Sequence, residues 1–203
     1  MNLVDYAFIT LSEVKEALEL SGTEHDARLN GYINRATDMI ETYCKRRFLS
    51  TAYTNEVYSA QSGSTLQLRN FPVTSLGSLE YSTSDFNNTH YDAVDTSLYA
   101  LQTSNGLDRG VVYLTGGFST GINNWRATYT AGYALANVPN DLKEALIEIV
   151  SYLFNRRKAT PGMKSETLGR YSYTLDSAMP GTSGLIEKLG IDTILDSYRT
   201  ITV

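Results

Sequence analysis

Residues 125–158 decide the fold, and their sequence is WRATYTAGYALANVPNDLKEALIEIVSYLFNRRK. Apolar and polar residues alternate up to Gly132, a period that predicts a strand with one buried face. From Leu142 the apolar residues recur at spacings of three and four, which predicts an amphipathic helix over 139–157. Pro139 suits the start of that helix, and Asn140 or Asp141 is expected to cap it. The stretch therefore predicts a strand, a turn and a long helix.

The buried faces of this strand and this helix are expected to supply the core of the subunit. Acidic residues lie near the predicted start of the helix and basic residues near its end, which agrees with the helix dipole. The residues that we expect in the structural core are Trp125, Tyr129, Gly132, Tyr133, Pro139, Leu142, Leu146, Ile149 and Leu153.

Three further helices are predicted outside this stretch. Thr10 and Glu13 have the spacing of a capping box and predict a helix near 10–20. Thr23, with Asp26 three residues later, predicts the start of a long amphipathic helix over 24–47. Its basic end at 45–47 suits the helix dipole, while a phosphate or partner contact there is the less favoured interpretation. A last helix is predicted over 183–197, interrupted near Gly190.

The middle of the chain, residues 51–133, is rich in β-forming residues. We expect strands at 52–58, 65–69 and 72–81, followed by a hairpin of 98–102 with 110–114. The polar segment 82–90 and the glycine-containing segment 115–124 are predicted to be loops. A break over 159–169 precedes a predicted strand at 171–175.

Together these patterns predict an α+β fold. It consists of a small helical bundle with a β-rich insertion between the second and third helices. We expect a domain over 1–158, with its insertion at about 51–133, and a C-terminal extension over 159–203 that holds a short strand and a helix.

The composition narrows the class of protein. The net charge is −5, so the chain lacks the basic excess of a protein that grips nucleic acid by its phosphates. Fifteen tyrosines fit either a partly wet protein interface or simply strand-rich segments. No apolar run is long enough to cross a membrane, and the N-terminus lacks a basic signal segment, so we expect synthesis in the cytoplasm. The single cysteine, Cys44, is expected to be a small buried side chain.

No constellation of catalytic or metal-binding residues is evident. The two histidines, His25 and His90, stand in no recognisable order with a nucleophile and an acid. The acidic group around His90, formed by Asp85, Asp92 and Asp95, lacks the glycine and closing glutamate of a calcium loop. Residues 116–121 lack the Lys-Ser/Thr of a phosphate-binding loop. We therefore expect neither an enzyme nor a cofactor.

The order of two blocks resembles the head-tail connector (adaptor) family of tailed phages. One block comprises Tyr129–Tyr133, Val138–Ala145 and Asn155–Arg157, and the other comprises Ile9–Leu18 and Ile40–Phe48. The resemblance implies a virion structural protein that forms a ring, expected to be a dodecamer, under the portal of a phage or prophage particle. Its implied partners are further copies of itself, the portal protein and a downstream neck or tail-completion protein. Genomic DNA would pass through the ring without sequence-specific binding, and no membrane is involved.

This resemblance also implies which parts of the chain make contacts. The loops predicted over 82–90 and 115–124 are candidates for the channel or a neighbouring subunit. The candidate interface residues are Phe118, Arg156, Arg157, Tyr171, Tyr173, Tyr198 and Ile201. Two alternatives remain open: another phage neck or tail-completion protein, and a small enzyme or ligand-binding protein whose site is dispersed in the sequence.

Overall fold

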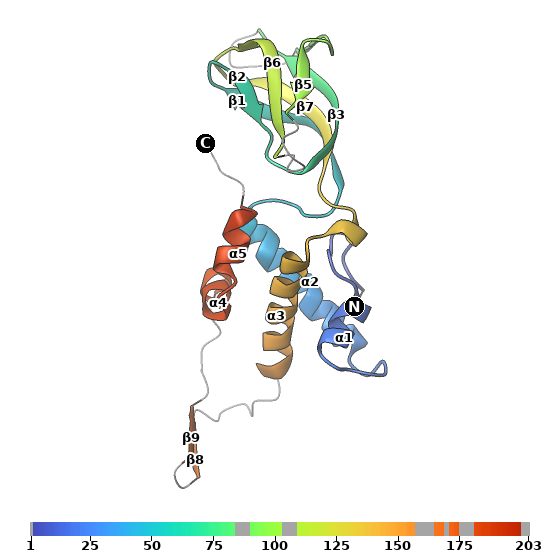
Figure 1. Ribbon diagram of the computed structural model, residues 1–203, viewed down its shortest axis with the longest axis vertical. Helices are drawn as coiled ribbons and strands as arrows, with labels where there is room; N and C mark the ends of the chain where they lie inside the picture. The colour runs from blue at the N-terminus through green and yellow to red at the C-terminus, as the bar shows by residue number, and fades with distance from the viewer. Residues whose placement is uncertain are drawn as a thin grey trace. The chain divides into compact units, whose positions relative to one another are not determined.

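The computed structural model describes residues 2–83, 90–102, 109–156, 165–168, 171–174 and 181–199, with the backbone alone for the two ranges between 165 and 174 (Figure 1). The chain divides into two compact units. The helical unit comprises Met1–Lys45 and Val138–Val203, and the β unit comprises Arg46–Asn137. Helices and strands are both well represented, so the predicted α+β class is confirmed.

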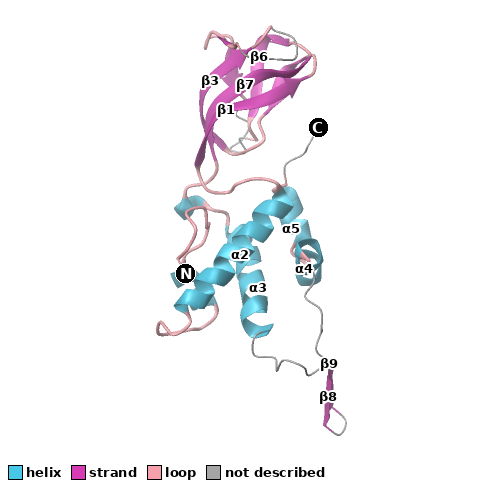
Figure 2. Cartoon of the chain, turned by 180° about the vertical axis from the view of Figure 1, so that it is seen from behind, coloured by secondary structure: helices cyan, strands magenta, loops and turns pink. Residues whose placement is uncertain are grey.

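The helical unit is built around two long helices (Figure 2). Its helices are α1 (Leu11–Ala17), α2 (Asp26–Cys44), α3 (Asn140–Arg156), α4 (Thr182–Leu189) and α5 (Asp192–Ser197). The long helices α2 and α3 pack on each other, and α1, α4 and α5 each contact both of them. The apolar stripe of α3 is buried as its spacing predicts, and it includes Leu142, Leu146 and Ile149.

The ends of these helices can be compared with the capping residues predicted from the sequence. Thr10 and Glu13 form the predicted capping box at the start of α1. The predicted second helix, 24–47, is too long at both ends. It begins at Asp26, preceded by His25, which makes no side-chain cap bond. It ends at Cys44 because Lys45 adopts a left-handed conformation, with φ of 57°.

The last predicted helix is two helices. Gly190 lies between α4 and α5 with φ of 69°, so the interruption predicted near this glycine is confirmed. Polar contacts fix α5 to the long helices. The Tyr43 hydroxyl donates to Asp196 at 3.0 Å, and the Tyr198 hydroxyl lies 2.8 Å from both carboxylate oxygens of Asp141. The buried Cys44 sulfur lies 3.5 Å from the carbonyl oxygen of Leu195.

The β unit contains two antiparallel sheets with one shared apolar core. The four-stranded sheet has the order β1 (Thr51–Ala60), β7 (Gly121–Ala131), β3 (Val73–Tyr81), β4 (Asp92–Ala93). The three-stranded sheet has the order β2 (Gly63–Gln67), β6 (Val111–Phe118), β5 (Tyr99–Leu101). A short 3-10 helix, Leu135–Asn137, follows β7. The shared core includes Tyr58, Leu66, Leu79, Val112, Trp125 and Tyr129.

The predicted loop over 115–124 is wrong, because most of it is strand. Strand β6 continues to Phe118 and β7 begins at Gly121. Gly116 and Gly117 have φ values of 91° and 84°, and they coincide with a shift in the β2–β6 register. A Cβ at Gly117 would lie 3.1 Å from the Gly63 carbonyl oxygen. These two glycines therefore serve an irregular strand pairing and not a loop.

Gly132 ends β7, as its place in the sequence predicts. Its φ is 111°, and a Cβ there would lie 2.5 Å from the carbonyl oxygen of Leu49. The adjacent Tyr133 forms an isolated parallel bridge with Leu49. The close approach of two backbone segments excludes any side chain at this position.

A separate antiparallel hairpin, β8 (Ser165–Leu168) with β9 (Tyr171–Thr174), lies between α3 and α4 in the sequence. The strand predicted at 171–175 is therefore present over 171–174. The break predicted over 159–169 is wrong at 165–168, where β8 lies; the rest of that range is outside the described residues.

Candidate interaction surfaces

The described ranges hold no built site for a metal ion. No three His, Cys, Asp or Glu side chains in those ranges converge on one point. His90 and Asp92 are exposed and form a contact of 3.1 Å, whereas Asp85 lies outside the described residues. The Asp95 carboxylate accepts hydrogen bonds from the backbone N–H and hydroxyl of Ser97, and these bonds lower its pKa. This acidic segment therefore shapes its own turn.

The most unusual polar cluster lies inside the β unit. The Glu56 carboxylate accepts hydrogen bonds from the hydroxyls of Tyr58 and Tyr129, which lie 3.0 Å from each other. Arg69 forms an ion pair with Glu56 at 3.3 Å, and the Asn70 amide donates to Tyr129 at 3.4 Å. Three segments of the chain, namely β1, β7 and the residues after β2, therefore meet through one carboxylate and its neighbours.

Burial and the hydrogen bond to Glu56 raise the pKa of Tyr129 to about 12. The same causes raise the pKa of Tyr58. Both phenols therefore keep their protons near neutral pH and act as hydrogen-bond donors in the cluster. It fixes β1 and β7 to the segment after β2. Sequence reasoning missed Glu56, although a lone acid among the tyrosines of one strand is a usable signal.

The residues predicted for a single core divide between the two units. Trp125 and Tyr129 are buried in the β unit, where Gly132 is also buried and Tyr133 is half-buried. Pro139 is half-buried in the helical unit, and the apolar residues buried there are Leu142, Leu146, Ile149 and Leu153. The strand and the helix are adjacent in sequence but contribute to different cores.

The candidate interface residues are placed as follows. Phe118 is buried in the β unit, 4.7 Å from the Trp125 ring between centroids, so it is a core residue in this structure. Arg156 donates to the Tyr152 hydroxyl at 3.0 Å, and Tyr198 is half-buried and bonded to Asp141. The remaining four are not described at side-chain level. Tyr171 and Tyr173 lie on β9, whose backbone alone is described, and Arg157 and Ile201 lie outside the described residues.

The basic run at 45–47 does not present three cations to solvent. Arg46 is 4% exposed, and its guanidinium lies 3.6 Å from the centroid of the Phe71 ring. A cation stacked on an aromatic face in a buried position stabilises the fold. The structure therefore places Arg46 in the β unit as a packing residue, which argues against a phosphate contact there.

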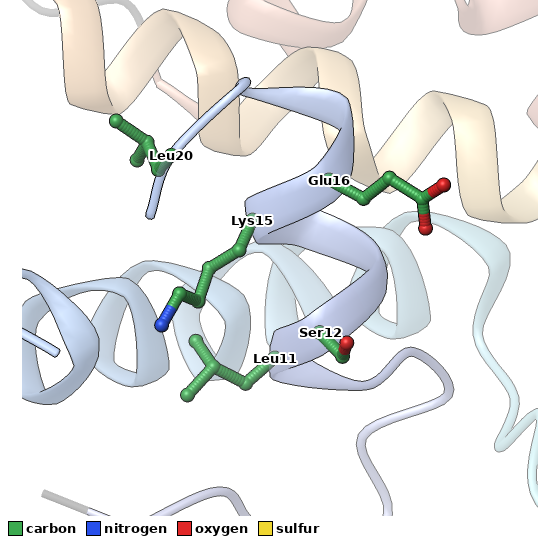
Figure 3. Close-up of a pocket in the computed structure, with 5 residues that line it drawn as sticks. All are labelled: Leu11, Ser12, Lys15, Glu16 and Leu20. Atoms are coloured by element: carbon green, nitrogen blue, oxygen red, sulfur yellow. The ribbon is translucent and has the colours of Figure 1, made fainter. Parts of the chain in front are cut away.

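A hollow lies on the surface of the helical unit along α1 (Figure 3). It is lined by Leu11, Ser12, Lys15, Glu16 and Leu20. Lys15 already forms an ion pair with Asp26 at 2.8 Å, and Glu16 extends to the other side of the helix. This hollow brings together no pair of groups that could carry a reaction.

The outer face of the three-stranded sheet carries no charge. Strand pairing places Thr65, Tyr113 and Ala100 in one row, with Leu98 beside Thr115 in the next. Tyr113 is 48% exposed and Leu98 is 43% exposed. We call this the three-strand face, and its members are Thr65, Gln67, Leu98, Ala100, Gln102, Val111, Tyr113 and Thr115. Sequence reasoning predicted the hairpin but not that its outer side is uncharged.

The outer face of the four-stranded sheet is also close to neutral. Its single ion pair joins Arg126 to Glu80, and the Arg126 guanidinium stacks 4.4 Å from the Tyr91 ring centroid. Its other residues are Ala52, Val57 and four with hydroxyl groups, and Gly77 adds a position without a side chain. We call this the four-strand face, and its members are Ala52, Val57, Ser75, Ser78, Glu80, Arg126, Thr128 and Thr130.

No helix in the described part of the chain has the length and apolar character that a membrane span requires.

Comparisons with known proteins identify the chain's relatives. The fold is similar to that of chains in three solved assemblies, each aligned over 100% of this chain. The first is the neck of an empty GTA particle computed with C6 symmetry, with a TM-score of 0.59, 18% identity and 95% of that chain covered. The second is the neck of a native GTA particle computed with C12 symmetry, with a TM-score of 0.58, 18% identity and 94% of that chain covered. The third is the virion of a native gene transfer agent particle, with a TM-score of 0.55, 19% identity and 95% of that chain covered. No curated protein matches the sequence at a significant level. The model of the head completion protein family matches residues 7–201, and the chain therefore belongs to the head completion protein family.

Proposed function

We propose that this protein is a structural component of the neck of a phage or phage-like particle, where it connects the DNA-filled head to the tail. The observation that carries the proposal is the family match over residues 7–201. The similarity in fold to chains of particle necks, over the full length of this chain, supports it.

In this proposal identical subunits form a ring under the portal, and the genome leaves through its channel. The cyclic symmetry of the two similar neck assemblies supports a ring. A ring requires heterologous contacts that close on themselves. The net charge of −5 suits a wall that DNA passes without strong attachment. The portal protein and a downstream neck or tail-completion protein are its proposed partners, and no bond is made or broken.

The helical unit is the proposed docking body. Its core joins segments from both ends of the chain, since α1 and α2 pack with α3, α4 and α5. A body tied together in this way can transmit force between head and tail. The C-terminal extension, including the β8–β9 hairpin, is proposed to contact the portal protein.

The test is deletion of the gene from the phage or prophage that encodes it. Electron microscopy should show DNA-filled or leaking heads without tails, and a plasmid copy of the wild-type gene should restore joined particles. Nuclease protection measures retention of the genome in the same preparations. Joined heads and tails that keep their DNA in the deletion strain would contradict the proposal. An isolated chain that binds a small molecule saturably would instead favour the enzyme or ligand-binding alternative.

A further inference from the structure

The two outer faces of the β unit carry few or no charged side chains. The three-strand face has seven exposed positions and the half-buried Val111, and none of these residues is charged. Charged side chains make up 19% of the whole sequence. The nearest described charges along the chain, Arg69, Asp95 and Arg109, lie outside its paired rows, and Arg69 forms an ion pair with Glu56. Depletion of charge with an exposed tyrosine near the centre is typical of the middle of a protein–protein contact.

The chemistry of this face excludes two classes of partner. It has no cation to neutralise a phosphate, so it does not suit nucleic acid. Its only large exposed apolar side chains are Leu98 and Tyr113, which is too little apolar area to suit a lipid surface. A protein surface that is neutral and hydrogen-bonding is the partner that remains.

The four-strand face has the complementary character. Its one cation and one anion, Arg126 and Glu80, neutralise each other. Because Ser75, Gly77 and Ser78 have small side chains or none, an exposed tyrosine can come close to the backbone of β3. Its threonine hydroxyls can exchange hydrogen bonds with the tyrosine hydroxyl.

The topology sets these faces on opposite sides of one core. Leu66 and Val112 point inward from the three-stranded sheet, and Leu79 and Ala127 point inward from the four-stranded sheet. Strand alternation then turns the two outer faces away from each other. A contact between unlike faces of identical units repeats in a head-to-tail manner, and such a contact can close into a ring.

We propose that the three-strand face of one copy packs on the four-strand face of the next copy, with Tyr113 at the centre of the contact. This inference rests on the proposed ring function and names the surfaces that would form it. The occupant is a second copy because the same chain carries both complementary faces. The contact is a property of the chain alone and forms in solution at high protein concentration.

Cysteine cross-linking of the purified full chain tests the pairing. The double variant Tyr113→Cys/Thr128→Cys should give a ladder of disulfide-linked multimers under a mild oxidant, because each copy offers one thiol on each face. Each single variant alone should stay uncross-linked, and an equimolar mixture of the two should stop at the dimer. The wild-type chain is the control for its buried Cys44.

Three results would overturn the proposal. Dimers from Tyr113→Cys alone would show that like faces meet. An absence of multimers from the double variant would show that these faces do not pair. Cross-links that form just as readily when the two thiols are placed on exposed positions outside the two faces would show random collision.

A charge at the centre gives a second, independent test by sedimentation. Tyr113→Lys should lose the concentration-dependent association of the wild type, because it places an unpaired cation in the contact. Tyr113→Phe should retain it, and the fluorescence of Trp125 reports that both variants are folded. Association of Tyr113→Lys equal to that of the wild type would overturn the proposal. Because the deletion experiment does not depend on these faces, unjoined particles in the deletion strain together with absent cross-links would refute this inference and leave the proposed function standing.

Discussion

The helical unit and the β unit differ in how they use charge. Of 17 basic and 22 acidic residues, the β unit holds five and six, although it covers nearly half of the chain. In the helical unit, ion pairs such as Lys143 with Glu13, at 2.6 Å, link one helix to another, and Glu41 is buried. In the β unit, the half-buried Glu56 lies among tyrosines, and the two outer faces carry few or no charged side chains. The two units therefore differ in how many charges they carry and in where those charges lie.

This contrast can be tested because each unit has its own optical reporter. Trp125 is the only tryptophan and lies in the β unit, whereas the described α-helices lie in the helical unit. Tryptophan fluorescence therefore follows unfolding of the β unit, and far-ultraviolet circular dichroism mainly follows the helices. Units with separate cores are expected to respond separately to substitutions.

The largest expected effect is that of Gly132→Ala in the β unit. A Cβ would lie 2.5 Å from the Leu49 carbonyl oxygen at a φ of 111°, so backbone must move. We expect the free energy of unfolding of the β unit to fall by about 4 kcal/mol, measured by fluorescence in urea. Gly116→Ala is the matched control, because its φ is 91° but no atom lies within 4 Å of its Cβ. It should cost only about 1 kcal/mol. Equal losses for the two variants would contradict the steric explanation.

Leu146→Ala should affect the other unit by a slightly smaller amount. Leu146 is fully buried on α3, and its truncation should cost the helical unit about 3 kcal/mol. The exposed Glu148→Ala, two residues further along the same helix, is the control and should change stability by less than about 0.5 kcal/mol. The circular dichroism transition should shift while the fluorescence transition does not. A common shift of both would show that the two units unfold as one.

Tyr129→Phe tests the half-buried cluster around the Glu56 carboxylate. Loss of one donor to Glu56 should destabilise the β unit by about 2 kcal/mol, whereas loss of the exposed hydroxyl in Tyr113→Phe should be close to neutral.

The same cluster predicts a dependence on pH. The pKa of Tyr129 is raised to about 12, above its usual value of about 10. Between these values the unfolded chain releases the proton while the folded chain retains it, so stability should fall as pH rises from about 10 to about 12. Tyr129→Phe should show a smaller fall over this range. An identical pH profile for both proteins would mean that the phenol does not titrate differently on folding.

The smallest expected effect separates two capping predictions made from sequence. Thr10→Ala removes the acceptor for the Glu13 N–H and should cost the helical unit about 1 kcal/mol. Thr23→Ala should cost almost nothing at the start of α2, because that helix begins at Asp26 after His25. The circular dichroism transition measures both variants. A larger loss for Thr23→Ala than for Thr10→Ala would reverse this assignment.

Sequence reasoning succeeded where one local pattern determines the outcome. The stripe from Leu142, the capping box at Thr10 and the interruption at Gly190 each depend on neighbours within a few turns, and each is present. The end of α2 was harder to predict, because the left-handed conformation of Lys45 is not a preference of lysine itself.

The wrong or missing predictions concern features that depend on contacts between segments distant in the sequence. Gly116 and Gly117 suggest a loop in isolation, but their pairing with the segment around Gly63 makes them part of a strand. Periodicity identifies the buried face of a strand or helix but not the element that packs on that face. It therefore does not reveal that Trp125 and Leu142 belong to different cores. The enclosure of Glu56 likewise depends on β7 and on the segment after β2.

The position of Cys44 gives the protein an intrinsic probe of its own opening. Its sulfur is shielded in the helical unit and lies 3.5 Å from the Leu195 carbonyl oxygen. An alkylating reagent can reach the thiol only after the helices that bury it have separated, and the sequence has no second cysteine to label. The labelling rate therefore measures how often the helical unit opens around Cys44 in the otherwise unmodified protein.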